Sequence, residues 1–118
     1  MKITKIFTFD AAHFLPNYKG KCKNLHGHCW KLEVSFEGEV NDETGMVIDF
    51  NAIANICDEV VEKLDHRLVN DLIPNPTAEN MIKWIKDEID VEINFSEFPK
   101  VCGIKLWETP NSYAEETY

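Results

Sequence analysis

The hydrophobic and polar positions of the chain alternate along two stretches in its first third. The first runs from Lys2 to His13, and its odd positions include the apolar residues Ile3, Phe7, Phe9 and Ala11. The second begins at His26, and its even positions are His28, Trp30, Leu32, Val34 and Phe36. Side chains of a strand alternate between its two faces, so both stretches predict half-buried strands. His13 ends the inner face of the first strand, and His26 and His28 share the apolar face of the second.

Further along the chain the apolar spacing becomes helical. Ile53, Ile56, Val60 and Leu64 predict an amphipathic helix over residues 51–64, with Asp49 or Asn51 as its cap. Before it, NDETG predicts a turn and MVIDF a short strand. A second helix follows Pro74 and Pro76, with Thr77 as its cap and Ile82, Ile85 and Ile89 as its inner stripe.

The last predicted element is a strand, KVCGIKLWET. Its expected buried row is Cys102, Ile104 and Leu106, and the row ends in the carboxylate of Glu108. We therefore expect a single α+β domain over residues 1–118, with two helices on one face of an antiparallel sheet. Cys57 falls on the apolar stripe of the first helix and is expected to be an inert core residue.

Composition and charge narrow the classes of function. The 118 residues carry a formal charge of -9, which disfavours nucleic acid as a partner. No apolar stretch is long enough to cross a bilayer, and the N-terminus lacks the hydrophobic region of a signal peptide. We expect a cytoplasmic protein with no membrane partner, whose four cysteines are reduced.

Three histidines define a candidate metal site. Two antiparallel strands could bring His13, His26 and His28 to one point, and a catalytic zinc site has three protein ligands and one open position. Each histidine alone would more simply be a hydrogen-bonded core or loop residue. A rival structural site would use Cys22, His26, His28 and Cys29, but strand alternation turns Cys29 to the opposite face. Cys22 lies among Lys19, Lys21 and Lys23, a positive setting that suits a reactive thiolate as well as a ligand.

Three carboxylates and one more histidine complete the candidate chemistry. Asp65 could orient His66, although neighbouring side chains normally diverge and a capping role at the helix end is the simpler interpretation. Glu108 on a buried strand face needs a partner or a ligand. Glu79 in the first turn of the second helix could simply be a favourable partner of the helix dipole.

Six segments, taken together, resemble a known family. Their order along the chain is that seen in the 6-pyruvoyltetrahydropterin synthase family. The segments are FDAAHFL, CKNLHGHCW, GMVIDF, LDHRLVN, NPTAENMIKWI and LWET. The C-x3-H-G-H spacing of Cys22 to His28 is most similar to the bacterial and archaeal branch that makes 6-carboxytetrahydropterin for queuosine biosynthesis.

The resemblance implies a T-fold and a homo-oligomer, typically a hexamer, with active sites between subunits. It implies Zn²⁺ on His13, His26 and His28, with Cys22, Asp65 and His66 as acid–base groups. Glu108, Thr77 and Glu79 would bind the pterin. The implied substrate is the small molecule 7,8-dihydroneopterin triphosphate, with the three loop lysines as candidate triphosphate contacts. Alternatives are a synthase that stops at the pyruvoyl product, a homologue that acts on a related pterin, and a zinc-containing pterin-binding protein without turnover.

Overall fold

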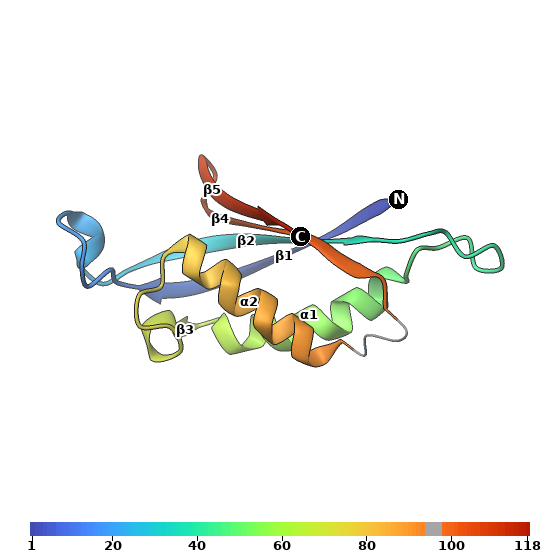
Figure 1. Cartoon of the computed structure of the whole chain (residues 1–118). Helices are drawn as coiled ribbons and strands as arrows, with labels where there is room; N and C mark the ends of the chain where they lie inside the picture. Colours follow the sequence, from blue (N-terminus) through green and yellow to red (C-terminus); the bar gives the residue numbers. More distant parts are fainter. Residues whose placement is uncertain (94–97) are drawn as a thin grey trace.

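A five-stranded sheet with both helices on one of its faces makes up the structure, a computed structural model that describes residues 1–93 and 98–118 (Figure 1). The strands are β1 (Lys2–His13), β2 (His26–Glu37), β3 (Arg67–Leu68), β4 (Lys100–Thr109) and β5 (Ser112–Thr117). The helices are α1 (Phe50–Leu64) and α2 (Ala78–Glu92), and short 3-10 turns occupy Lys21–Lys23 and Val69–Asp71. The strand order is β3-β1-β2-β4-β5, and only the β1–β3 pair is parallel.

The register of β1 and β2 determines where the histidines lie. The two strands pair antiparallel along their whole length, from Lys2 opposite Glu37 to His13 opposite His26. Both predicted strands are confirmed, and their apolar rows face α1 and α2, where Phe9, Trp30 and Leu32 are buried. The pairing thus places the predicted histidines at one end of the sheet, where β1 ends and β2 begins.

Both helices begin at the predicted caps. The Asp49 side chain accepts a hydrogen bond from the N–H of Asn51 at the start of α1. The Thr77 hydroxyl accepts one from the N–H of Asn80 at the start of α2. Such caps satisfy backbone donors that have no partner within the helix. The inner stripes of both helices are buried, and Cys57 is buried among them, where loss of solvation raises the pKa of its thiol to about 12.

Three expectations about the strands were wrong. MVIDF is not a strand, because Asp49 already caps α1 and the Met46 carbonyl accepts from the N–H of Asn41 to close a turn. Cys102 is not in the buried row, because the register between β2 and β4 shifts there and Val101 takes the inner position.

The third correction is that Lys100–Thr109 is not the last element. The chain turns back into β5, which pairs with β4 and forms one edge of the sheet. β5 has only Ala114 packed against the core, so its sequence lacks the apolar row that revealed the other strands.

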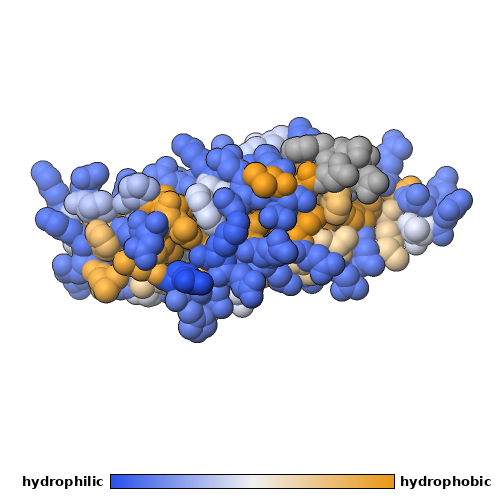
Figure 2. Space-filling view, turned by 90° about the horizontal axis from the view of Figure 1, so that it is seen from below, coloured by the Kyte–Doolittle hydropathy of each residue, from blue (hydrophilic) through white to orange (hydrophobic). Residues whose placement is uncertain are grey.

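The outer surface of the helical layer is mainly hydrophilic, with smaller hydrophobic patches between the polar residues (Figure 2). Neither helix in the described part of the chain is long and apolar enough to span a bilayer.

Candidate metal centre and adjoining cleft

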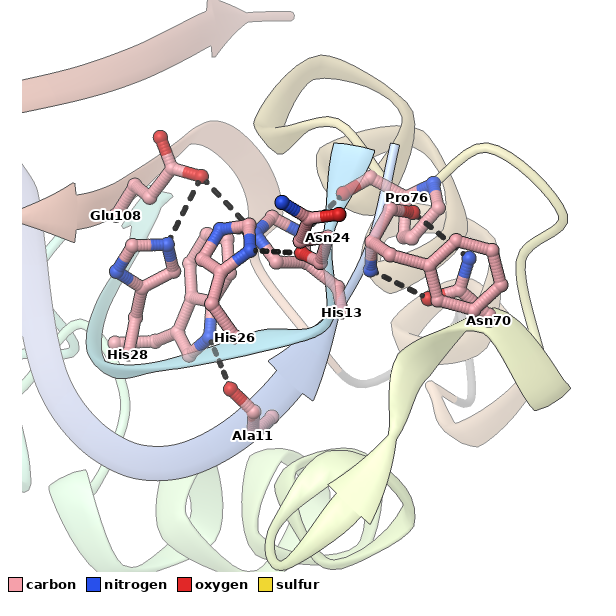
Figure 3. Close-up of polar contacts among 10 residues, drawn as sticks. Ala11, His13, Asn24, His26, His28, Asn70, Pro76 and Glu108 are labelled. Atoms are coloured by element: carbon pink, nitrogen blue, oxygen red, sulfur yellow. Dashed lines mark hydrogen bonds and ion pairs between the residues drawn. The ribbon is translucent and has the colours of Figure 1, made fainter. Parts of the chain in front are cut away.

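His13, His26 and His28 converge at the end of the β1–β2 pair (Figure 3). The Nε2 atoms of His13 and His26 are 3.1 Å apart. One ligand atom from each of the three histidines and one oxygen of Glu108 all lie within 4.8 Å of one another. The sequence predicted that these side chains would meet, and the structure brings them together. Their role as metal ligands stays a prediction.

The hydrogen bonds of two imidazoles decide which ring nitrogens face each other. His13 Nδ1 lies 2.8 Å from the carbonyl oxygen of Pro76, and His26 Nδ1 lies 2.7 Å from that of Asn24. A carbonyl oxygen only accepts, so each Nδ1 carries the hydrogen and each neutral ring presents an Nε2 lone pair. Two lone pairs 3.1 Å apart repel unless a cation lies between them. The donor set therefore fits a metal ion.

Burial favours the neutral form of two of these imidazoles, which is the form that binds a metal. His13 is fully buried, and loss of solvation lowers its pKa; the same cause lowers the pKa of His28. The Nε2 of His28 is also buried, and it has no hydrogen-bond partner within residues 1–93 and 98–118. The Trp30 ring lies edge-on to both His13 and His28, with centroids 5.2 and 5.3 Å away. Neutral imidazoles with free lone pairs on an apolar floor are suited to bind zinc.

Glu108 approaches the cluster from β4. Its Oε1 lies 3.3 Å from Nε2 of His13 and 3.4 Å from Nε2 of His28 (Figure 3). The side chain is 31% exposed, so part of the carboxylate also reaches solvent. The sequence predicted this carboxylate at the end of a buried row, and the family resemblance implied a pterin as its ligand. Its contact with the histidines was not predicted.

A cleft of about 340 Å³ adjoins Glu108. Its lining includes Thr77 and Glu79 from the start of α2, and Tyr18 and Tyr113 from two other segments. The structure therefore places the three predicted pterin-binding residues around one cavity. Its volume lies in the range of small-molecule sites. The sequence did not identify the two tyrosines as cleft residues. The one feature that could have indicated them is that they lie a few positions from Cys22 and Glu108 in the sequence.

Asp65 and His66 lie in contact but outside this cluster. Asp65 Oδ1 is 2.9 Å from His66 Nδ1 and also accepts a hydrogen bond from the N–H of Asp10. The expectation that neighbouring side chains diverge was wrong, because His66 has a φ of 57° and its ring folds back to Asp65. The Asp10 N–H and the His66 side chain lower the pKa of the Asp65 carboxyl. The pair lies at the β3 edge of the sheet, beside a second hollow of about 600 Å³.

The two remaining cysteines of interest lie apart from the histidines. Cys29 is exposed on the opposite face, where a hydrogen bond to Asp10 raises the pKa of its thiol. Cys22 lies in the 3-10 turn of the loop between β1 and β2, and its carbonyl accepts from the N–H of Leu15. Among the described residues, neither thiol joins the histidine cluster, so the rival cysteine–histidine site is not assembled.

Known proteins are similar to this chain over nearly its whole length. Residues 2–117 match the profile of the family described as 6-pyruvoyl tetrahydropterin synthase. A Rickettsia bellii protein named 6-carboxy-5,6,7,8-tetrahydropterin synthase is 35% identical over 136 residues, which cover 98% of the chain and 99% of that relative. A Haemophilus influenzae protein with the same name is 32% identical over 140 residues, covering 97% of the chain and 96% of the relative.

The chain therefore belongs to the 6-pyruvoyl tetrahydropterin synthase family. Its fold is similar to that of the 6-pyruvoyl tetrahydropterin synthase of Caenorhabditis elegans, with a TM-score of 0.89 and 22% identity over all of the chain and 95% of that structure. The predicted α+β T-fold is confirmed. The two sequence relatives, from Rickettsia bellii and Haemophilus influenzae, both bear the name 6-carboxy-5,6,7,8-tetrahydropterin synthase.

Proposed function

We propose that the protein is a zinc-dependent 6-carboxy-5,6,7,8-tetrahydropterin synthase of queuosine biosynthesis. It converts 7,8-dihydroneopterin triphosphate and water to 6-carboxytetrahydropterin, acetaldehyde and triphosphate. The observation that carries this proposal is the cluster of His13, His26, His28 and Glu108 beside a cleft of about 340 Å³. Relatives over nearly the full chain length bear the name of a 6-carboxytetrahydropterin synthase.

His13, His26 and His28 would hold the metal, since their Nε2 atoms offer the converging lone pairs described above. A bound Zn²⁺ supplies Lewis-acid stabilisation of negative charge on the oxygens of the substrate side chain. The protein contributes orientation: hydrogen bonds to Pro76 and Asn24 fix two of the rings, as partners of metal-binding histidines commonly do.

The cleft next to the metal centre would bind the pterin ring. Glu108 accepts paired hydrogen bonds from the guanidine-like edge of the pterin, an arrangement that gives both strength and geometric selectivity. Thr77 and Glu79 complete the pocket. Lys19, Lys21 and Lys23 in the exposed loop between β1 and β2 are the candidate contacts for the triphosphate.

Cys22 and the Asp65–His66 pair would move protons. The Cys22 thiolate removes the proton from the first side-chain carbon, next to the ring imine. His66, oriented by Asp65 at 2.9 Å, returns a proton elsewhere on the side chain. Loss of triphosphate and cleavage of a carbon–carbon bond complete the conversion.

A complete site would form between subunits. The histidines project from the helix-facing side of β1 and β2, whereas Asp65 and His66 lie beyond the edge of β1. We infer that the pair of one subunit serves the metal centre of another in a homo-oligomer, a hexamer by resemblance. The open sheet edge and the 600 Å³ hollow beside His66 offer room for such a neighbour.

The test is incubation of zinc-loaded protein with 7,8-dihydroneopterin triphosphate, followed by measurement of acetaldehyde and of pterin mass. Acetaldehyde with a 6-carboxytetrahydropterin supports the proposal. Triphosphate release with a pyruvoyl pterin and no acetaldehyde would assign the alternative synthase activity. Binding without consumption of the substrate would instead make the protein a pterin-binding protein.

A further inference from the structure

We propose that Glu108 is a displaceable fourth ligand of the metal. In this view its carboxylate completes the metal site when no substrate is present and leaves it to hold the incoming pterin. The identity of the displacing ligand rests on the proposed function, whereas the metal contact rests on the geometry of this chain alone.

Three distances between donor atoms of this cluster are close to those expected for a tetrahedral metal site. Four ligands at about 2.0–2.1 Å from one zinc ion lie roughly 3.3–3.4 Å from one another. Glu108 Oε1 is 3.3 Å from Nε2 of His13 and 3.4 Å from Nε2 of His28. His13 and His26 are 3.1 Å apart at the same atoms. The carboxylate oxygen thus occupies the position of a fourth ligand.

These contacts are not ordinary hydrogen bonds. His13 has its hydrogen on Nδ1, which donates to Pro76, so its Nε2 faces the Glu108 oxygen with a lone pair. The Nε2 of His28 likewise has no hydrogen-bond partner. A carboxylate oxygen is also only an acceptor when it is ionised. Two acceptor atoms at such a distance repel each other unless a cation lies between them. The same cation would also be bound by His28 Nε2 in the tautomer that carries its hydrogen on Nδ1.

The same carboxylate cannot serve the metal and the pterin at once. Paired hydrogen bonds to a guanidine-like edge use both carboxylate oxygens in one plane. In the structure Oε1 is directed at the histidines, although Glu108 also lines the cleft together with Thr77 and Tyr113. Rotation of the side chain about its terminal bonds would turn it from one partner to the other.

This exchange has a chemical consequence. A metal with four protein ligands resists loss and has no open position, whereas a metal with three accepts a substrate oxygen. Pterin binding at Glu108 would therefore open the metal when the substrate side chain arrives. The carboxylate would act as a positioning residue that couples recognition of the ring to activation of the side chain.

The test measures metal binding without turnover. Metal-free wild type, Glu108→Gln and Glu79→Gln are titrated with Zn²⁺ in competition with a coloured chelator. Glu79 lines the same cleft and carries the same charge, but it is outside the ligand cluster. We expect Glu108→Gln to bind zinc about 10- to 100-fold more weakly, as when a supporting group of a metal site is lost. Glu79→Gln should bind it as the wild type does.

The visible spectrum of the Co²⁺-substituted protein gives a second measurement. Neopterin is added as a probe, and its binding is followed separately by its own fluorescence. The wild-type spectrum should change when neopterin binds, because a carboxylate leaves the metal. The spectrum of Glu108→Gln should differ from that of the wild type before neopterin is added. It should also change less than the wild-type spectrum when neopterin binds.

Equal zinc affinity of Glu108→Gln and wild type would overturn the proposal, as would a Co²⁺ spectrum that stays unchanged while neopterin is bound. The wild-type spectrum needs no variant, so it decides the question even where a substitution impairs folding. The proposed function can fail independently of this metal contact. If the protein neither binds nor converts the pterin, the zinc titration still shows whether Glu108 is a ligand.

Discussion

Acid should destabilise the metal-free protein through the buried His13 and the partly buried His28. His13 and His28 have a pKa below the ordinary value of 6.5, mainly because burial disfavours the charged imidazolium. In the unfolded chain both titrate normally, so below about pH 6.5 the unfolded state binds more protons than the folded state. The contribution of these two groups to the free energy of unfolding should therefore be constant above about pH 6.5. As the pH falls below this value, the free energy of unfolding should decrease.

The size of the effect follows from the number of groups. One proton taken up on unfolding changes the free energy of unfolding by about 1.4 kcal/mol per pH unit. Two histidines with lowered pKa give a limiting slope of about 2.7 kcal/mol per pH unit. A domain of this size is typically stable by about 5–15 kcal/mol, so one unit of acidification would remove a substantial share.

The assay is urea unfolding with a chelator present, from about pH 7.5 to about pH 5. The matched control is the His13→Asn/His28→Gln double variant. Asn at position 13 retains a donor for the Pro76 carbonyl, and neither amide titrates. We expect the wild-type curve to fall more steeply than the control below about pH 6.5. Parallel curves would show that His13 and His28 bind protons equally in the folded and unfolded states, and a wild type that gains stability would show that a shared proton bridges the imidazoles.

Four further outcomes are expected. Zinc at about 100 times its dissociation constant should add about 2.7 kcal/mol to the free energy of unfolding, measured by urea unfolding, and His26→Ala should abolish this gain. Cys22→Ala should lower product formation at least about 100-fold while zinc content, measured by atomic absorption, is unchanged; lost zinc would make Cys22 a ligand instead. His66→Ala should lower turnover without changing zinc affinity, and an unchanged rate would remove it from the reaction. Thr77→Ala should cost about 1 kcal/mol of stability in urea, whereas Thr77→Ser should retain most of it; equal losses would argue against the cap.

Sequence periodicity predicted the strands and helices that have one buried face and one exposed face. β1, β2, α1 and α2 all have a continuous apolar row. β1 and α1 lie within one residue of their predicted bounds, β2 begins at the predicted His26, and α2 follows the predicted cap Thr77. β5 has no such row, because its residues gain stability from pairing with β4 rather than from burial. The bulge at Cys102 was hidden for a related reason: it depends on the register with β2, which a single strand does not encode.

The candidate site shows the same division between local pattern and tertiary contact. Alternation placed His13, His26 and His28 on inner faces, and the antiparallel pairing of β1 with β2 brought them together. The contact of Glu108 with two of them depends on how β4 lies against β2. The contact between Asp65 and His66 depends on one backbone angle, which no spacing rule predicts.

We expect nitrogen and oxygen atoms to hold the metal while the Cys22 sulfur stays free. X-ray absorption at the zinc edge of the loaded protein tests this directly, since Zn–N bonds of about 2.0–2.1 Å are distinct from Zn–S bonds of about 2.3 Å. We expect imidazole nitrogens with one further light atom and no sulfur in the first shell. A sulfur neighbour at about 2.3 Å would instead make a cysteine a zinc ligand, and a protein that retains no zinc would show that the histidine cluster is not a zinc site.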